Sequence, residues 1–285
     1  MYKSETLCTS KLERTQIENV EQWLLSASSA SPAAYYHIQS GGSRTRAKLC
    51  IATCNALELP LNTTLALSTC VELLHNASLI HDDLQDGDEV RRGRPSVWKR
   101  FGKAIALCAG DLMLSNAYGA LSKVEETNKL PILICRVSEY VSLTIEGQCQ
   151  DIHQHCKTLA EYESIAAEKS GPLLQLALCL PLLTSGNSKA AETASMALRN
   201  FAIAYQIVDD LNDWPSDEAT GQLNIVNLLA RESNKEQAYS LARARAQYLL
   251  KRCETELATL PCDSGAAAQN ACQQLFGKVC RSQYE

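Results

Sequence analysis

The sequence predicts an all-α protein, and three observations support this. Apolar residues recur at three- and four-residue spacing through several long segments, which is the period of an amphipathic helix. No alternating apolar and polar pattern of useful length is present, nor is an Asn-Gly hairpin turn. Chain-breaking residues gather in short clusters between the apolar segments. Together these features favour a large helical bundle over any fold built on a sheet.

Six segments carry the helical pattern most clearly. In the first, Leu67 and Val71 lie on one apolar face, and Asn62, Thr63 and Thr64 offer capping side chains at its start. No intervening segment is long enough for an interdomain linker, so we expect one domain over residues 1–285 with about ten or more helices. The six expected helices cover residues 62–86, 104–124, 131–152, 162–183, 190–214 and 235–257.

Composition excludes several classes of protein. The chain has 285 residues, of which 46% are hydrophobic and 21% charged, so it is neither disordered nor fibrous and can bury a sizeable core. The formal net charge is −5, which gives no electrostatic footprint for nucleic acid or anionic lipid. Any anion that the protein binds must therefore meet a local basic cluster.

The thirteen cysteines include no CxxC pair, and most lie within apolar helical patterns. We interpret them as reduced, small hydrophobic residues of a cytosolic protein. A zinc site at His153, His155 and Cys156 is the alternative, but a solvated helix end is favoured because a second pair of ligands is missing.

No membrane or export signal is expected. The first twenty residues lack the apolar core of a secretory signal. The longest apolar run, residues 171–183, is too short to span a bilayer and is framed by prolines. We therefore expect a cytoplasmic protein without an integral membrane segment, in which residues 171–183 form a buried helix.

An acidic motif, D-D-x-x-D, ends the first predicted helix. Asp82 and Asp86 lie about one turn apart on the same face, and Asp83 stands beside them. Like charges at a helix carboxyl terminus repel one another and oppose the macrodipole, unless a hard cation neutralises them. Oxygen ligands alone favour Mg²⁺. For one such motif taken alone, a solvated acidic face remains the simpler interpretation.

A second motif at the same spacing changes that balance. Asp209, Asp210 and Asp213 end another apolar helix, and Gln206 shares their face. Two carboxylate triplets that face one another across a cleft would hold several metal ions, for which a diphosphate is the natural bridging anion.

Basic residues beside the acidic motifs suit the diphosphate. Arg91 and Arg92 follow the first triplet, and Lys169 lies in a separate helix. Arg44 and Arg46 follow a Gly-Gly pair that lets the backbone approach an anion closely. Each is an ordinary surface charge when taken alone, whereas together with the triplets they indicate a diphosphate site.

Six motifs in this order resemble those of the trans-isoprenyl diphosphate synthases, the polyprenyl synthetase family. The motifs are "ELLHNASLIHDDLQD", "RRGRP", "AGDLML", "EGQCQDI", "EKSGPLL" and "YQIVDDLND", and the resemblance covers roughly residues 40–230. It implies an isoprenoid synthase fold with a central helical cavity, usually homodimeric. It also implies an Mg²⁺-dependent prenyltransferase that condenses an allylic diphosphate with isopentenyl diphosphate to an all-trans prenyl diphosphate.

The resemblance assigns roles to particular residues. Asp82, Asp86 and Asp209 would bind Mg²⁺ with support from Asp83, Asp210 and Asp213; Arg91, Lys169 and Gln206 would hold the allylic diphosphate; Arg44, His75 and Arg92 would hold the isopentenyl diphosphate; and Ser170 and Gln148 would lie near the developing cation. Metal and cationic groups stabilise charge on the leaving diphosphate, and an apolar cavity keeps the allylic cation from water. The isopentenyl double bond then attacks the cation, and a proton is lost.

Two departures from the family pattern bear on the reaction. Ser43 and Gln222 stand where the family usually has lysine. The loss of a charge-assisted hydrogen bond costs about 1.5–3 kcal/mol, so the isopentenyl site would be weakened. A terpene synthase that ionises a single allylic diphosphate is therefore one alternative. A non-catalytic partner subunit is another, although all six aspartates are retained.

Product length would depend, by the same resemblance, on the side chains just before the first triplet. Ala77 and Ser78 are small, with Leu74 and Val71 deeper along the helix. Small residues would let the growing chain pass, which favours farnesyl, geranylgeranyl or longer products. Ordinary helix packing explains the same residues equally well.

Overall fold

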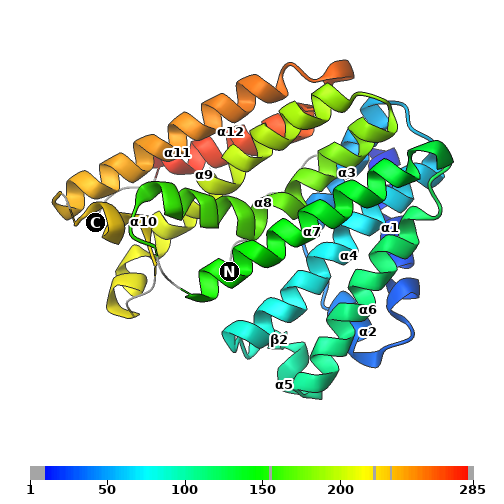
Figure 1. Ribbon diagram of the computed structural model, residues 1–285, viewed down its shortest axis with the longest axis horizontal. Coiled ribbons are helices and arrows are strands. Elements are labelled where there is room, and N and C mark those ends of the chain that lie inside the picture. The colour runs from blue at the N-terminus through cyan, green and yellow to red at the C-terminus, as the bar shows by residue number, and fades with distance from the viewer. Residues whose placement is uncertain (1–9, 154–155, 221–222, 232, 282–285) are drawn as a thin grey trace. The chain divides into compact units, whose positions relative to one another are not determined.

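A computed structural model describes residues 10–153, 156–220, 223–231 and 233–281. These residues are helical apart from turns, connecting segments and one short hairpin, which confirms the all-α prediction (Figure 1). The elements are α1 (Lys11–Ser28), α2 (Pro32–Gln39), α3 (Thr45–Ala56), α4 (Leu61–Asp86), β1 (Val90–Arg91), β2 (Arg94–Pro95), α5 (Val97–Phe101), α6 (Lys103–Leu121), η1 (Thr127–Lys129), α7 (Leu130–His153), α8 (Leu159–Thr184), α9 (Ser188–Thr220), α10 (Ile225–Leu229), α11 (Lys235–Leu257), η2 (Pro261–Asp263) and α12 (Ala266–Arg281).

The six predicted helices are all present, as α4, α6, α7, α8, α9 and α11. The expected cap of α4 is wrong, however. Its N-cap is Pro60, and no side chain caps it. The Thr64 hydroxyl instead donates to the Pro60 carbonyl at 3.0 Å. The fixed φ of proline prepares the chain for a helix, so α4 begins one residue before Asn62.

The first two helices also carry readable start signals. Ser10 and Glu13 form a capping box at α1, in which each side chain bonds the other's backbone N–H. Ser31 caps α2 and is followed directly by Pro32. Helix α2 has only eight residues and α1 is polar on average, so neither is among the long apolar segments of the sequence.

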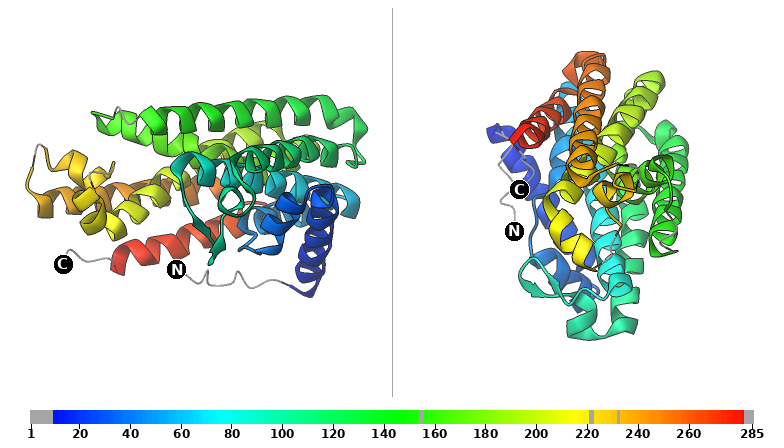
Figure 2. Two further views of the ribbon diagram at one scale, coloured as in Figure 1. Left: turned by 90° about the horizontal axis from the view of Figure 1, so that it is seen from below. Right: turned by 90° about the vertical axis from the view of Figure 1, so that its left-hand side faces the viewer.

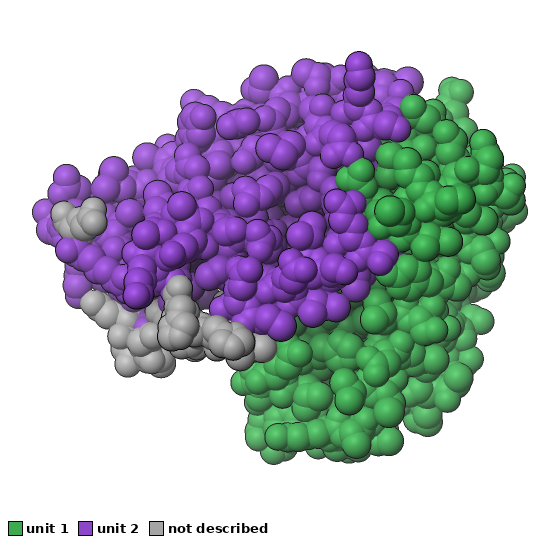
Figure 3. Space-filling view, in the orientation of Figure 1, with its two compact units in different colours: residues 1–136, 180–186 green, residues 137–179, 187–285 purple. Residues whose placement is uncertain are grey.

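The chain divides into two compact units, coloured separately in Figure 3. Unit 1 comprises residues 1–136 and 180–186. Its centre is α4, which packs against α1, α3 and α6. Every residue from Thr63 to Leu74 is buried, so α4 is covered on all sides over these turns.

A two-stranded hairpin follows α4 in unit 1. Val90 pairs with Pro95, and Arg91 pairs with Arg94, in antiparallel register. The two turn residues, Arg92 and Gly93, both have positive φ, at 54° and 74°. This is the backbone of a primed turn, normally built from Asn-Gly, which explains why the sequence pattern missed it.

Unit 2 comprises residues 137–179 and 187–285. Helices α9, α11 and α12 pack side by side in it (Figure 2). The short helix α10 lies against α9 and α11 and is capped by Asn224, whose side chain accepts from the Val226 N–H. This cap fixes the chain just after the second acidic triplet.

Two apolar helices bear on the membrane prediction. Residues 171–184 of α8 are all buried, which confirms a buried helix there. By length and composition alone, α6 is long and apolar enough to cross a membrane. The sequence predicts a helix over residues 104–124 but no membrane span there, and Ile105 and Leu107 of α6 are about half exposed, at 49% and 51%.

Candidate active site

The first acidic triplet divides into one buried carboxylate and two at the surface. Helix α4 ends at Asp86 and is closed by Gly87, with φ 76°. Asp83 is completely buried, whereas Asp82 is half-buried and Asp86 is exposed. The middle residue therefore lies in the interior of unit 1, and the outer two lie where a solvated cation can reach them.

Asp83 binds Arg91 of the hairpin. The Arg91 Nε–H donates to Asp83 Oδ1 at 2.7 Å, and an Nη2–H donates to the same oxygen. Burial raises the pKa of Asp83, while the Arg91 guanidinium opposes that rise. Among the described residues, the buried Oδ2 of Asp83 has no hydrogen-bond partner. Asp83 thus fixes the position of Arg91.

Arg92 lies against the Gly-Gly loop. Its Nη1 donates to the Gly41 carbonyl and, at 3.3 Å, to the Ser40 hydroxyl. A Cβ on Gly42 would lie 2.9 Å from the Arg92 Cζ atom, which is closer than real side chains allow. Gly42 also has φ 142°, a conformation that other residues rarely adopt. The second glycine therefore makes room for Arg92.

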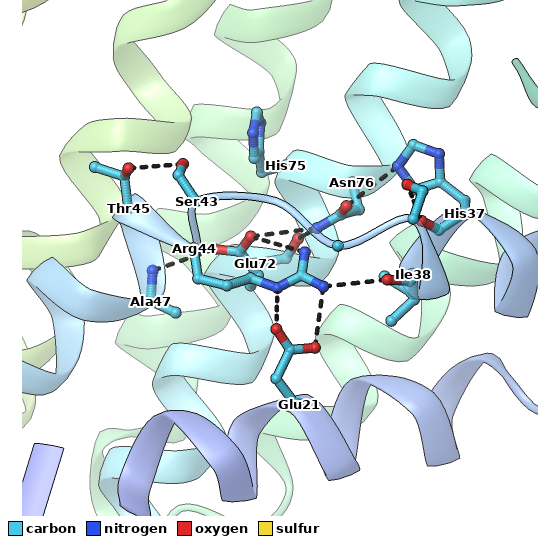
Figure 4. A network of polar contacts seen from close by, with 12 residues as sticks. Glu21, His37, Ile38, Ser43, Arg44, Thr45, Ala47, Glu72, His75 and Asn76 are labelled. Carbon is cyan, nitrogen blue, oxygen red and sulfur yellow. Dashed lines mark hydrogen bonds and ion pairs between the residues drawn. The ribbon is translucent and has the colours of Figure 1, made fainter. Parts of the chain in front are cut away.

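Arg44 has a different setting from the one the family resemblance implied. It is only 4% exposed and donates to both oxygens of Glu21, at 2.6 and 3.0 Å. It also reaches Glu72 at 3.5 Å and the Ile38 carbonyl at 3.3 Å (Figure 4). Its φ of 52° is left-handed, so backbone strain is accepted to place it there. Two carboxylates already neutralise this guanidinium, which makes it a poor candidate for binding a diphosphate.

Arg46 is a further basic residue in this region, to which the family resemblance assigned no role. It is half-buried on α3, and its charge, together with that of Arg92, lowers the pKa of His75. Burial is the largest cause of that lowering, so His75 is a neutral imidazole near pH 7. Burial and neighbouring Arg44 likewise lower the pKa of Arg92. The signal was present in the sequence, because Arg46 follows the same Gly-Gly pair as Arg44.

Ser43, at the position of the expected lysine, is exposed, and its hydroxyl lies 2.9 Å from that of Thr45. It contributes no charge to this group of cations. Gln222, the second departure, lies outside the described residues.

The second triplet divides in the same way as the first. Asp210 is 3% exposed, and its Oδ2 accepts from the Tyr162 hydroxyl and the Ile225 N–H, both at 2.8 Å. Its Oδ1 accepts from the Gln206 amide at 2.8 Å. Burial raises the pKa of Asp210 to about 6, while these hydrogen bonds oppose the rise. The Asn224 amide donates to the Asp210 backbone carbonyl at 2.7 Å, so Asp210 joins α8, α9 and α10.

Asp209 and Asp213 are the outward members of this triplet. Asp209 is half-buried and Asp213 is exposed. Burial, followed by repulsion from Asp213 and Asp210, raises the pKa of Asp209 to about 6. A cation bound between Asp209 and Asp213 would relieve this repulsion. Sequence reasoning missed Tyr162 and Asn224, which hold Asp210 in the interior.

The remaining predicted residues of unit 2 lie on α7 and α8. A Cβ on Gly147 would be 2.5 Å from the Glu168 carbonyl carbon and 2.6 Å from the Lys169 nitrogen, so the two helices touch at this point. Gln148 is 8% exposed, and neither amide atom of its buried side chain has a partner among the described residues. Lys169 is half-buried, while the Ser170 side chain is outside the description.

The carboxylates fit magnesium. Within the described part of the chain, no three His, Cys, Asp or Glu side chains converge to hold a metal by themselves. Magnesium is normally held by one or two carboxylates, with water and substrate phosphates as its other ligands. Two outward aspartates in each triplet match this donor set. For the alternative zinc site, Cys156 is buried and its thiol donates to the Thr158 carbonyl, while His155 and the His153 side chain lie outside the description.

The chain is similar in sequence to known proteins of one family. The sequence profile of the polyprenyl synthetase family matches residues 28–226. The chain is 34% identical over 194 residues to a geranylgeranyl diphosphate synthase of Methanosarcina mazei, which covers 65% of this chain and 59% of that protein. It is 31% identical over 192 residues to a farnesyl diphosphate synthase of Geobacillus stearothermophilus, covering 64% of this chain and 65% of the relative. The matches thus span less than two thirds of these relatives.

Solved structures share the fold. A geranylgeranyl pyrophosphate synthetase from Geoglobus acetivorans superposes with a TM-score of 0.83 over 93% of this chain and 99% of that one, at 21% identity. A geranyltranstransferase from Thermotoga maritima superposes with a TM-score of 0.73 at 25% identity, over 94% and 98% of the two chains. The all-α architecture predicted from the sequence is therefore that of known isoprenyl synthases.

Proposed function

Because the chain belongs to the polyprenyl synthetase family, we propose that it is a prenyltransferase which condenses an allylic diphosphate with isopentenyl diphosphate. The products are a longer all-trans prenyl diphosphate and free diphosphate. The names of its relatives, which are geranylgeranyl and farnesyl diphosphate synthases, support this substrate class.

One observation carries the proposal: both aspartate triplets divide in the same way. Asp83 and Asp210 are buried and hydrogen-bonded, whereas in each triplet one outer member is half-buried and the other is exposed. A solvated acidic face would leave all members of a triplet in water. An anchored middle residue with two outward carboxylates is instead an arrangement that prepares a cation site.

We assign the binding of Mg²⁺ to the outer residues, Asp82 and Asp86 in unit 1 and Asp209 and Asp213 in unit 2. Asp83 and Asp210 then act as positioning residues, in keeping with the supporting role expected for them, and Asp213 is added to the expected ligands Asp82, Asp86 and Asp209. When bound, Mg²⁺ neutralises negative charge on the leaving diphosphate.

The cations divide between the two substrates. Arg91, held by Asp83, binds the allylic diphosphate, as does Lys169 in unit 2. Arg92, Arg46 and neutral His75 bind the isopentenyl diphosphate, while Arg44 supports the loop beneath them. Arginine suits this role because its planar fork matches phosphate oxygens.

Three residues of unit 2 complete the assignment. Gln206 donates one amide N–H to Asp210 and so orients that carboxylate, while its second N–H is left to bind the allylic diphosphate. Gln148 and Ser170 lie near the developing allylic cation. The two unpartnered amide atoms of Gln148 support this placement, since buried polar atoms normally find a partner.

Product length follows from the wall of α4. Ala77 and Val71 are buried and Ser78 is half-buried, with its hydroxyl donating to the His75 carbonyl at 2.9 Å. The small side chains at 77 and 78 support a product of farnesyl length or longer.

Three further properties belong to the proposal: the two units act as one domain, the chain forms a homodimer, and it works in the cytoplasm. The half-exposed Ile105 and Leu107 of α6 offer an apolar surface for a second copy. All described cysteines are free, as a reducing compartment requires. Light scattering of the purified protein would test the dimer, and an Ile105→Glu variant should reduce it to monomers.

Product analysis tests the central proposal. Purified protein is incubated with Mg²⁺, isopentenyl diphosphate and, in turn, dimethylallyl, geranyl and farnesyl diphosphate, and the products are identified by mass spectrometry. We expect a longer prenyl diphosphate, and we expect that none is formed when EDTA is present from the start. If no starter is elongated or consumed, the proposal fails.

A terpene synthase is the second candidate, because Ser43 replaces a cation beside the proposed isopentenyl site. In the same experiment it would consume an allylic diphosphate and yield a hydrocarbon or alcohol without elongation.

A further inference from the structure

A cavity in unit 1 lies apart from every residue assigned above. Its volume is about 290 Å³, and its walls come from α1, α4 and the carboxyl-terminal turns of α6. This is near the lower end of the volumes that hold small ligands, roughly 300–1,000 Å³. Helices α1, α4 and α6 all pack against one another, so the cavity is part of a built core rather than a loop.

The inner wall of the cavity combines an apolar surface with one unsatisfied hydroxyl. Leu73 and Ala120 are buried and line it. Thr69 also lines it and is 2% exposed, and among the described residues its Oγ1 has no hydrogen-bond partner. Leaving a buried hydroxyl unpaired costs about 1–3 kcal/mol, which a ligand or a bound water would recover.

The rim of the cavity carries one positive charge. Lys123 is exposed, and its ammonium nitrogen lies 4.1 Å from the centroid of the Trp23 ring. Stacking on an indole holds the ammonium in place without neutralising it. None of the described lining residues is acidic. Asn116 ties α6 to α1, because its amide donates to the Ala27 carbonyl at 2.7 Å, so this rim has a fixed shape.

We propose that this cavity binds a small carboxylic acid with a compact apolar body and a hydrogen-bonding group at its far end. The carboxylate pairs with Lys123, the apolar body lies against Leu73 and Ala120, and the far group bonds the Thr69 hydroxyl. A polyphosphate is a poorer match, since Lys123 is the only cation among the described residues that line the cavity. The proposal does not depend on the prenyltransferase activity, and its tests measure binding.

Three aromatic probes separate the parts of the proposal. 4-Hydroxyphenylacetate carries both end groups, phenylacetate lacks the hydroxyl, and 4-hydroxyphenylethanol lacks the charge. Binding to the full chain is followed by ligand-observed NMR titration. We expect 4-hydroxyphenylacetate to bind at least threefold more tightly than either of the others.

Variants then locate the binding. A Cβ added at Gly119, which lines the cavity, meets no atom within 4 Å, so the side chain of Gly119→Leu starts in open space and should weaken the binding of 4-hydroxyphenylacetate at least tenfold. Gly277→Leu is the matched control in α12, where an added Cβ meets only the end of the Arg281 side chain at 4.0 Å. Thr69→Val should bind 4-hydroxyphenylacetate and phenylacetate equally tightly, because the hydroxyl that distinguishes them has lost its partner. Lys123→Gln should bind 4-hydroxyphenylacetate and 4-hydroxyphenylethanol equally tightly, because the carboxylate has lost its cation.

Each result decides the matter. Weaker binding in Gly119→Leu, with the control unchanged, supports the site. Binding that is equally strong in Gly119→Leu places the acid elsewhere and overturns the proposal, as does the absence of measurable binding to the unaltered chain. Thermal unfolding of each variant shows whether it is folded, and Lys123→Gln, which changes an exposed side chain, provides a test should the core variant Thr69→Val fail to fold.

Discussion

The Arg91 guanidinium places two N–H groups on a single oxygen of Asp83, a carboxylate that is completely buried. The acidic residue at the centre of a D-D-x-x-D motif thus supports the hairpin beside it. Asp82 and Asp86, on the same stretch of helix, have no such burial. Three neighbouring aspartates therefore serve two different purposes.

The first prediction compares Asp83→Ala with Asp82→Ala. Removing the Asp83 carboxylate leaves the half-buried Arg91 without this partner. Because breaking such a pair costs about 3 kcal/mol, the free energy of unfolding of Asp83→Ala should fall by about that amount. Asp82→Ala instead relieves repulsion in the metal-free protein, so its free energy of unfolding should change by less than about 0.5 kcal/mol while turnover is lost. Urea unfolding and the product assay measure the two effects separately.

The comparison between these variants is the control. If the free energy of unfolding fell by several kcal/mol in Asp82→Ala, the assignment of Asp82 as an outward ligand would be contradicted. Unchanged stability in Asp83→Ala would show that the ion pair contributes nothing to the fold.

Gly42→Ala should displace Arg92. The added methyl group would lie 2.9 Å from the Arg92 Cζ and Nη2 atoms, so the guanidinium must move away from the loop. We expect the KM for isopentenyl diphosphate to rise about tenfold, with kcat less affected, because Arg92 binds the substrate before the chemical step. Steady-state kinetics with varied isopentenyl diphosphate measures this change.

Gly41→Ala is the matched control for that experiment. Gly41 has φ 78°, so alanine strains the backbone there too, but its Cβ would meet no atom within 4 Å. A similar rise in KM for both variants would mean that backbone strain, rather than contact with Arg92, controls affinity.

His37 should make the protein sensitive to acid. Burial, followed by the charge of Arg92, lowers its pKa to about 3, against the raising effect of its hydrogen bond to Asn76. Since the unfolded chain titrates near 6.5, its histidine binds the proton first as pH falls. The contribution of neutral His37 to the free energy of unfolding is therefore fully present well above pH 6.5 and is lost progressively as the pH falls to about 3. One pKa unit corresponds to about 1.4 kcal/mol, so the loss at pH 5 should be about 2 kcal/mol.

In the wild-type protein, the side-chain oxygen Oδ1 of Asn76 accepts a hydrogen bond from His37 Nε2 at 3.1 Å. His37→Gln tests this assignment, because glutamine cannot titrate but can still donate an N–H to that oxygen. The difference in unfolding free energy between pH 7 and pH 5 should shrink by about 2 kcal/mol. Some acid sensitivity should persist, since His75 also has a lowered pKa. An unchanged difference would exclude His37 as the source.

Most of the fold could be predicted because its long helices are long segments rich in apolar residues, with chain-breaking residues between them. The expected segment 235–257 coincides with α11, and 62–86 differs from α4 by one residue. The hairpin could not be predicted, because its turn places Arg92 at a positive φ that local sequence preference disfavours. Tertiary contacts, including those of Arg92 with the Gly41 loop, stabilise that conformation.

The candidate site was predictable as a set of residues but not as a set of roles. Spacing put Asp82, Asp83 and Asp86 at one helix end, yet it cannot tell which carboxylate is buried. That depends on Arg91 from the hairpin, just as the burial of Asp210 depends on Tyr162. Arg44 and Arg46 look equivalent in the sequence, and the bonds of Arg44 to the distant Glu21 and Glu72 become visible in the fold alone.

The last prediction concerns Ser43, which is exposed beside the proposed isopentenyl site. Ser43→Lys adds a cation next to Arg46 and Arg92 at little cost to stability, since the side chain remains in solvent. A charge-assisted contact contributes about 1.5–3 kcal/mol, so the KM for isopentenyl diphosphate should fall by about tenfold or more, and salt should weaken the gain. Thr45→Lys is the control, because the Ser43 and Thr45 hydroxyls are 2.9 Å apart and the net charge changes equally. An equal fall in both variants would indicate general electrostatic attraction. No fall in Ser43→Lys would mean that Arg46 and Arg92 already bind the diphosphate fully without the family's lysine.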